Sequence, residues 1–503
     1  MLPPSSLTDA LAAASPRLSP QPTPWISTLI QGGAMGLWAL LCLRAFLPHG
    51  AFAWAVGIVY VGYDTALLGF VAWQTRGLLR RTQPADLTGQ PRPTLGVIVA
   101  AHNEASVLPT TLAALFVQTE QPDLIVIADD GSSDGTAALL QEAFGFAPPP
   151  SGHLSAPSPR HPNLRWLRLP HGGKPAALNA ALVIGDTDLL MTVDADTLLD
   201  RDAVAAMRRA FAADPCLVAA TGILTPVCGR TASGRLFQWF QTFEYLRNFL
   251  SRYAWMEADS LLLISGAFAG FRTAAVREVG GFDAAFLVED YELIHRLRRH
   301  SVARGLGWTT AVVGACRAVT EAPGAIAPFL RQRRRWFGGF LQTQFWYRDM
   351  IGNRAYGRLG RWMLPVKSLD TMQPIYGLTA FGLLVFYLAS GRLALVGLVA
   401  GVMGAKLAVD LAFHLWSIRL YRAWAGPAHR PGFVSGVAAA LLEPFSFQLL
   451  RHLGAALGWV TFLTGRREWG VQRRAGLADL AATSADPAPP TLPDALATTS
   501  PCP

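Results

Sequence analysis

A strand followed by two acids, Leu189-Leu-Met-Thr-Val-Asp-Ala-Asp196, decides the fold of this chain. A short apolar run of this kind predicts a buried strand of a parallel sheet. Asp194 and Asp196 follow directly at its carboxyl end, where ligands bind in open α/β sheets. Two carboxylates one residue apart can hold a divalent cation, and the same pattern also arises by chance. Their position directly after the strand favours a metal site for Mg²⁺ or Mn²⁺.

Two earlier stretches repeat this pattern of a strand and then polar residues. Leu95-Gly-Val-Ile-Val-Ala-Ala101 is an apolar run that precedes a helix-like segment, and Leu124-Ile-Val-Ile-Ala128 ends in Asp129 and Asp130. Strands that alternate with helices predict a parallel sheet. Acids at a strand end are well placed to hold a nucleoside, whereas the alternative is an Asp/Gly turn that caps a helix.

Three residues further along are candidates for contact with a phosphate or a sugar. Lys174 is the only lysine between residues 91 and 330, and it can neutralise a phosphate as a point charge. A solvated loop cation is the alternative. Ser265 and Gly266 offer backbone that a flat sugar ring can approach closely, because glycine has no side chain. Ordinary strand packing explains them equally well.

Acidic and basic motifs complete the series. Glu289 and Asp290 open a helix-like stretch, where one carboxylate can accept the proton of an attacking hydroxyl, although acids are favoured at any helix N-terminus. Gln332-Arg-Arg-Arg-Trp336 follows. The fork of Arg335 suits a phosphate, and Trp336 offers a face on which a pyranose can stack. A cationic anchor with an interfacial tryptophan is a second explanation, and both can hold.

Composition indicates an integral membrane protein, since 51% of the 503 residues are hydrophobic and the mean hydropathy is +0.29. A spanning helix needs about 20 apolar residues. Residues 25–74 contain two such segments and predict a transmembrane hairpin, and residues 368–464 predict a C-terminal transmembrane region. Within that region Pro444 and Arg451 leave one span, two short spans or an interfacial piece plus a span open.

The remaining boundaries also follow from composition. Residues 1–24 are expected to be a disordered tail, and residues 465–503 a basic and then disordered tail. Between the membrane segments, residues 91–330 predict one soluble domain, and residues 331–367 the Gln/Arg/Trp motif with interfacial helices. Arginines flank the spans, so the positive-inside rule places the domain in the cytoplasm and explains the net charge of +9 better than nucleic-acid binding does.

Taken together and in this order, the motifs are specific for one group of proteins. Asp129-Asp130, Asp194-x-Asp196, Glu289-Asp290 and Gln332-x-x-Arg335-Trp336 resemble those of the membrane-embedded glycosyltransferases of family 2, which include the cellulose, chitin, hyaluronan and poly-N-acetylglucosamine synthases. The resemblance covers roughly residues 91–336 and the flanking helices. It implies an α/β GT-A fold, a Rossmann-like nucleotide-diphospho-sugar transferase domain, inserted between transmembrane α-helices.

The resemblance also implies a role for each matching residue. It places Asp130, and with it Asp129, at the uridine, and Asp194 and Asp196 at the metal and the diphosphate. Asp290 resembles the general base, and Lys174 stands where the family often has a lysine. The implied contacts with the diphosphate and the acceptor sugar are Gln332, Arg335 and Trp336.

These features predict an inverting, processive glycosyltransferase of the inner membrane. It would polymerise a β-linked polysaccharide at the cytoplasmic face and move the polymer across the bilayer. The layout most resembles that of the poly-N-acetylglucosamine synthases, and this resemblance implies UDP-N-acetylglucosamine as the first choice of donor and UDP-glucose as the second. An inverting transfer needs a base and a metal but no covalent nucleophile. The expected partners are the donor, a growing polysaccharide or lipid acceptor, the bilayer and accessory export subunits, with no nucleic acid.

Two residues inside an apolar segment, Lys406 and Asp410, are predicted to line the export route or to pair near it, because ionisable groups within a membrane usually face a bundle interior or an aqueous path. Two alternatives to the synthase stay open. One is a non-processive transferase that adds a single sugar to a membrane lipid, which product length distinguishes. The other is a non-enzymatic transport or binding subunit, which release of UDP by the purified protein would exclude.

Overall fold

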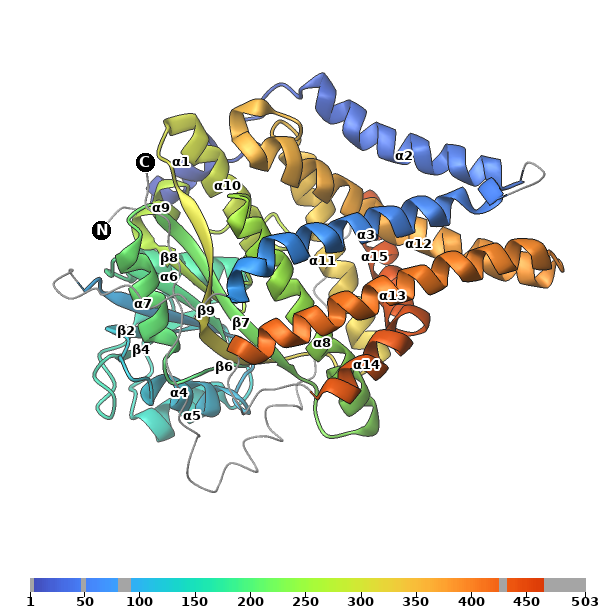
Figure 1. The fold of residues 1–503 in the computed structure, drawn as a ribbon. Coiled ribbons are helices and arrows are strands. Elements are labelled where there is room, and N and C mark those ends of the chain that lie inside the picture. Colours follow the sequence, from blue (N-terminus) through green and yellow to red (C-terminus); the bar gives the residue numbers. More distant parts are fainter. Residues whose placement is uncertain (1–3, 47–50, 80–91, 425–431, 466–503) are drawn as a thin grey trace.

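The computed structural model describes residues 4–46, 51–79, 92–424 and 432–465. The expectations for the C-terminal tail therefore fall almost entirely outside the described residues. Figure 1 shows a sheet with covering helices at one end of the molecule and long helices that extend away from it at the other.

A nine-stranded sheet forms the centre of the domain, with the order β3-β4-β2-β1-β5-β8-β7-β9-β6. Strand β1 pairs in parallel with β2 and β5, whereas β8 runs antiparallel to β5 and β7, so the sheet is mixed. Ala101 of β1 lies beside Asp129, and Ala100 lies beside Asp194, so the predicted acids meet at one edge of the sheet. The strands are β1 (Leu95–Ala101), β2 (Leu124–Asp130), β3 (His153–Leu154), β4 (Leu164–Leu169), β5 (Leu189–Asp194), β6 (Thr197–Leu199), β7 (Leu217–Val227), β8 (Phe268–Arg272) and β9 (Thr309–Glu321).

Helices cover both faces of the sheet, because its central strands are apolar on both faces. Val97 and Val99 pack in the cluster that contains α4, α5 and α7, whereas Ile98 packs in the cluster that contains α6, α8, α9 and α10. This alternation is the period-two pattern of a strand. The helices on the first face are α4 (Leu108–Phe116), α5 (Thr136–Phe144) and α7 (Ala203–Ala213); those on the second are α6 (Lys174–Ile184), α8 (Ala232–Glu257), α9 (Thr273–Glu278) and α10 (Glu289–Arg304).

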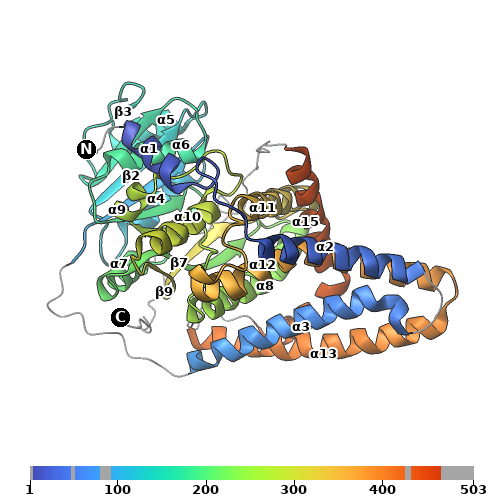
Figure 2. The ribbon, with the colours of Figure 1, turned by 90° about the horizontal axis from the view of Figure 1, so that it is seen from above.

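Four helical segments of the described chain are long and apolar enough to cross a membrane. Seen from above, they extend to one side of the sheet domain (Figure 2). Helix α11 (Ile326–Trp346) carries the Gln/Arg/Trp motif and leads, through η3 (Arg354–Tyr356) and the π-helical η4 (Leu359–Met363), into the third of them. The long helices are α2 (Trp25–Phe46), α3 (Ala55–Thr75, flanked by η1, Ala51–Trp54, and η2, Arg76–Leu79), α12 (Leu364–Ala389) and α13 (Leu393–Trp424).

The C-terminal apolar stretch is a broken helix pair. Helix α14 (Phe433–Leu442), η6 (Glu443–Phe445) and α15 (Phe447–Thr464) follow one another, and the two long pieces are bent by 48°. Pro444 lies at the break, where its missing N–H and its ring interrupt the helical hydrogen bonds. Taken together, the pair counts as one further candidate span.

The N-terminal segment differs from the disordered tail expected for residues 1–24. Pro4–Ala14 form helix α1, which packs against α9 and α10. Arg17 then forms an ion pair with Asp283 at 3.0 Å. Gly280 permits the close approach of α1, since a Cβ there would lie 2.2 Å from the backbone nitrogen of Leu11. The composition of the segment is that of a flexible chain, and the docking surface that orders it is made by distant segments of the sequence.

Candidate active site

Asp129 and Asp130 end β2, and their carboxylates point to different places. The Asp129 carboxylate is buried and accepts hydrogen bonds from the backbone of Ser132 and the indole of Trp166, so it does not line the cavity described below. Asp130 does line the cavity, and it accepts hydrogen bonds from the backbone N–H groups of residues 172 and 173 at 2.7 and 3.2 Å. Of the two acids predicted to contact a nucleoside, only Asp130 lies at the cavity.

Two histidines flank Asp130. The rings of His102 and His171 stack with centroids 4.3 Å apart, and the Nδ1 atom of His171 lies 2.9 Å from the Asp130 carboxylate. These three side chains are a group in the described chain whose ligand atoms lie close enough together to share a metal ion. Hydrogen bonds already account for the arrangement, because the Nδ1 atom of each ring is also within bonding distance of the Asp130 carbonyl.

The end of β5 brings Asp194 and Asp196 to the cavity together with Lys174. The Lys174 ammonium lies 2.5 Å from Asp194 and 3.9 Å from Glu289. Burial acts to lower the pKa of Lys174, but the carboxylates of Asp194 and Glu289 outweigh it and raise that pKa above its usual value. Lys174 is therefore a permanent cation at the carboxyl end of the sheet, rather than the solvated loop residue of the alternative explanation.

Asp290 is held by the loop that precedes β8. The Gly266 N–H donates a hydrogen bond to one oxygen of Asp290 at 2.6 Å, and the Tyr291 N–H donates to the other at 2.9 Å. A Cβ at Gly266 would lie 2.8 Å from the same carboxylate, so this close approach requires glycine. Ser265 and Gly266 both line the cavity. The loop thus orients an acid at the N-terminus of α10.

Glu289, next to Asp290, is buried, and its Oε2 atom has no hydrogen-bond partner among the described residues. Burial raises the pKa of Glu289 above its usual value, although the charge of Lys174 opposes the shift. A buried oxygen without a partner is costly unless a ligand supplies one. Glu289 is therefore suited to a hydrogen bond with a bound molecule.

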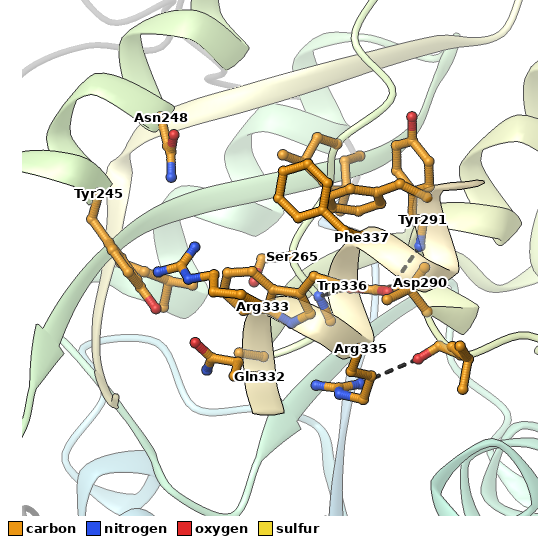
Figure 3. Close-up of a pocket in the computed structure, with 18 of the residues that line it drawn as sticks. Tyr245, Asn248, Ser265, Asp290, Tyr291, Gln332, Arg333, Arg335, Trp336 and Phe337 are labelled. Carbon is orange, nitrogen blue, oxygen red and sulfur yellow. Dashed lines mark hydrogen bonds between the residues drawn. The ribbon is translucent and has the colours of Figure 1, made fainter. Parts of the chain in front are cut away.

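Helix α11 presents Gln332, Arg335 and Trp336 to the same cavity (Figure 3). Gln332 is buried, and its Oε1 atom has no hydrogen-bond partner in the described chain. Arg335 donates a hydrogen bond to the Leu287 carbonyl at 3.3 Å. Trp336 lies under the guanidinium of Arg333, which is 4.5 Å from its ring centroid and pairs with Glu244 at 2.8 Å.

One cavity of about 1340 Å³ connects these residues with the long helices. It contains every predicted site residue except Asp129, and it continues to Asp64, Lys406 and Asp410. Lys406 pairs with Asp64 at 2.7 Å and with Asp410. Further ion pairs line the cavity: Lys367–Asp370, Arg247–Glu443, Arg451–Glu443, Arg451–Glu244 and Arg333–Glu244.

Sequence motifs did not identify one wall of the cavity, which α8 provides through Tyr245, Asn248 and Arg252. Their spacing of three and four residues is the only sequence signal for them, and the same spacing occurs on many helix surfaces. Which face of α8 meets the cavity depends on the packing of α8 between the sheet and the long helices.

Comparisons with known proteins agree with the geometry. Residues 96–280 match the family described as "Glycosyl transferase family 2", and residues 189–403 match "Glycosyl transferase family group 2". The poly-beta-1,6-N-acetyl-D-glucosamine synthase of Staphylococcus aureus strain COL is 28% identical over 286 residues, which cover 56% of this chain and 62% of the relative. The Staphylococcus epidermidis enzyme of the same name is 26% identical over 54% of this chain and 60% of its own length. Each match therefore spans less than two thirds of the relative.

Among solved structures, a mannosyltransferase from Pyrobaculum calidifontis in complex with GDP-Man and Mn²⁺ has a similar fold. The TM-score is 0.51, and the match covers 78% of this chain and 99% of that one at 19% sequence identity. At this identity the likeness concerns the fold alone.

Proposed function

We propose that this chain, which has the GT-A fold and matches the family 2 models, is an inverting, processive glycosyltransferase that polymerises a β-linked polysaccharide and moves it through its own membrane helices. The proposed donor is UDP-N-acetylglucosamine first and UDP-glucose second. The staphylococcal relatives, which their names describe as poly-N-acetylglucosamine synthases, support this order.

The observation that carries the proposal is the continuity of the cavity. At one end lie Lys174, Asp194 and Asp290, and at the other lie Lys406 and Asp410 on a candidate membrane span. A transferase that releases its product to the solvent after one addition has no need of a cavity that continues between membrane helices. A polymer made at Asp290 and passed along the helices does need one.

At the donor end, each side chain has a chemical task in this proposal. Asp290 accepts the proton of the attacking acceptor hydroxyl, since the hydrogen bonds from Gly266 and Tyr291 hold its carboxylate in place. Lys174 and Arg335 bring positive charge to the diphosphate. Trp336 offers the face against which the acceptor sugar stacks.

The carboxylates at the end of β5 fit a divalent cation. Oxygen ligands are those that Mg²⁺ and Mn²⁺ prefer, and the Lys174 ammonium between Asp194 and Glu289 indicates that the pocket favours positive charge. When bound at Asp194 and Asp196, such an ion would neutralise the diphosphate leaving group.

At the membrane end, the cavity wall is charged but balanced. Each of the lysines and arginines in the ion pairs described above has at least one carboxylate partner, and Lys406 has two. Asp64, Lys406 and Asp410 lie on candidate membrane spans, and paired charges within membrane helices are usually found along aqueous paths. Because these charges are paired, the wall suits a neutral sugar chain better than a polyanion.

We further propose the arrangement of the chain in the membrane. The hairpin of residues 25–74 and the region of residues 368–464 span the inner membrane, and the domain of residues 91–330 faces the cytoplasm, with residues 331–367 at the interface. The donor, the growing polysaccharide or a lipid acceptor, and the bilayer are the proposed partners. A contact with export subunits remains a prediction from the sequence.

The test is incubation of the purified, detergent-solubilised protein with Mg²⁺ or Mn²⁺ and a panel of radiolabelled UDP-sugars, with products separated by size. We expect high-molecular-weight polymer from one donor. A product that carries a single sugar on a lipid would show that the protein is a glycolipid transferase and not a polysaccharide synthase. The absence of UDP release with every donor would contradict both functions.

A further inference from the structure

The cavity-facing side of α8 includes three hydrogen-bond donors, next to Glu244 and Phe249. Tyr245, Asn248 and Arg252 line the cavity at spacings of three and four residues, which place them on one side of the helix. In Figure 3, Tyr245 and Asn248 lie on the other side of Trp336 from Asp290. Burial raises the pKa of Tyr245 to about 12, so its phenol stays protonated and can donate.

Arg252 stands apart from the other cavity arginines named so far, because within the described residues its guanidinium makes no hydrogen bond or ion pair. Its Nε atom is buried without an acceptor. Arg333 and Arg247, by contrast, pair with Glu244 and Glu443. The side chain of Arg252 is half-buried, and a buried Nε–H without an acceptor is unfavourable, so this N–H indicates that a ligand oxygen accepts a hydrogen bond from Arg252.

The surroundings of Arg252 indicate which ligand this is. Burial lowers the pKa of Arg252, and the nearby charges of Tyr245 and Asp290 oppose the shift, so the guanidinium lies within electrostatic reach of the proposed base. The charge of Asp290 also reaches Lys174, but Lys174 contacts the Asp194 carboxylate, and Arg335 contacts the Leu287 carbonyl, whereas Arg252 has no such contact within the described residues. An oxygen bound to Arg252 therefore lies within electrostatic reach of Asp290, the proposed base.

The packing of α8 also indicates that its cavity face contacts the acceptor. This helix packs against β7 and β9 of the sheet and against α3, α13 and α14, which are candidate spans or belong to one. Its cavity face is thus the wall along which a polymer would leave the site. Trp336 supplies an aromatic face and α8 supplies donors, and a pyranose, which has apolar ring faces and an equatorial rim of oxygens, matches both.

We propose that Tyr245, Asn248 and Arg252 form a binding subsite for the terminal sugar of the acceptor, in which Arg252 donates a hydrogen bond to a hydroxyl or acetamido oxygen of a neutral pyranose. The proposal rests on the proposed function, because it assumes that a sugar chain is the acceptor. It adds a specificity-determining contact that lies outside the motifs of the sequence.

The experiment compares Arg252→Gln and Arg252→Lys with Arg235→Gln, which removes an exposed arginine from the same helix. Initial rates of UDP release are measured against a short oligosaccharide of the preferred donor sugar, and separately against the donor. Since a hydrogen bond from a charged group is lost, we expect the acceptor KM of Arg252→Gln to rise roughly ten- to a hundredfold while the donor KM changes less than about twofold. Arg252→Lys keeps the charge and should restore some of the acceptor affinity, and Arg235→Gln should match the wild type.

The other outcomes overturn the inference in distinct ways. A rise in the donor KM alone would assign Arg252 to the diphosphate, and a fall in kcat with both KM values unchanged would assign it a structural role. If the wild type adds one sugar to a lipid, processive polymerisation is wrong, and the same comparison of KM values with that lipid as acceptor still tests Arg252. Glucose and N-acetylglucosamine oligosaccharides distinguish the hydroxyl from the acetamido oxygen.

Discussion

At the scale of single residues, Asp290 and Asp194 show how two carboxylates in one cavity can have different surroundings, which suit the different tasks proposed for them. Asp290 accepts hydrogen bonds from two backbone N–H groups and forms no ion pair within the described chain, whereas Asp194 is paired with Lys174. A carboxylate that is oriented without a bound cation suits proton transfer, and one that already attracts a cation suits a metal and a diphosphate.

The first prediction separates these two tasks. Asp290→Asn keeps an oxygen that can accept the Gly266 hydrogen bond but removes the basic group, so transfer should fall by about 10²- to 10⁴-fold while UDP affinity stays nearly unchanged. Asp194→Ala, as the comparison variant, should weaken metal-dependent donor binding instead. Turnover and calorimetric binding of UDP with and without the metal measure both effects, and normal turnover by Asp290→Asn would show that the base is another residue.

His295 gives a second prediction, which concerns stability and pH. Burial lowers the pKa of His295 to about 4, and its ring lies 2.8 Å from the Tyr291 carbonyl. Between pH 4 and the ordinary histidine pKa of about 6.5, the unfolded chain therefore binds more protons than the folded one, and the free energy of unfolding falls as the pH falls, by up to about 3 kcal/mol.

This loss in the free energy of unfolding is due to His295, so it should be smaller in His295→Gln. Thermal unfolding in detergent at about pH 7 and about pH 4.5 measures it, with the exposed His153→Gln as the control. If the melting temperatures of the wild type and His295→Gln decreased equally over this range, another group would have to carry the pH dependence.

At the scale of elements, the packing of α15 on α11 sets the position of the Gln/Arg/Trp motif. Gly454 and Gly458 are one helical turn apart and let the two backbones approach, since a Cβ at Gly458 would lie 2.6 Å from the Cβ of Phe337. Glu244 joins the same elements from α8, because it pairs with Arg333 of α11 and with Arg451 of α15. The motif helix and the second half of the broken pair are therefore expected to move as one unit.

A larger side chain at this contact should separate the two helices. Gly458→Leu places side-chain atoms against Phe337 and the backbone of residue 338, so we expect a loss of about 1–3 kcal/mol in stability and a larger fractional loss of transfer. Gly397→Leu on α13 is the matched control, since nothing lies within 4 Å of a Cβ there. The prediction is wrong if the two variants have equal melting temperatures and equal activity.

At the scale of the whole molecule, one cavity connects chemistry at the sheet edge with ion pairs between long helices. Asp64 on α3 and Lys406 with Asp410 on α13 come from segments more than 300 residues apart in sequence, and the ion pairs join the N-terminal hairpin to the C-terminal helices. These contacts join the long helices at the far end of the cavity, and the same cavity continues from there to the sheet domain.

The fourth prediction tests whether this cavity carries the polymer. Asp410→Leu removes one carboxylate but leaves Lys406 paired with Asp64, so the fold should persist. Polymer export should fall by about tenfold or more, because the leucine places an apolar side chain in a polar path. Val409→Leu, one position away on an exposed surface of α13, should export normally. The readout is radiolabelled polymer protected inside sealed vesicles after synthesis from outside donor; normal protection with Asp410→Leu would place the route elsewhere.

The GT-A fold could be predicted from the sequence because its signals are local. The apolar runs at Leu95–Ala101 and Leu124–Asp130 form parallel neighbours, and the acids at the ends of β2 and β5 meet because parallel strands end at one edge. The structural likeness confirms this class of fold. Local signals failed in two places. The composition of residues 1–24 is typical of a flexible chain, yet Pro4–Ala14 form a docked helix. Asp129 was predicted to contact a nucleoside, but its carboxylate accepts hydrogen bonds within the domain.

By itself, the sequence determined the class of fold, the order of the acidic motifs and the existence of long apolar helices, since each follows from residue type and short-range spacing. Only the tertiary structure decided that Arg252 faces the cavity unpaired among the described residues, that Glu244 joins Arg333 to Arg451, and that Asp64 meets Lys406. These contacts join residues that are far apart along the chain. Their geometry depends on how whole helices pack, which no local pattern encodes.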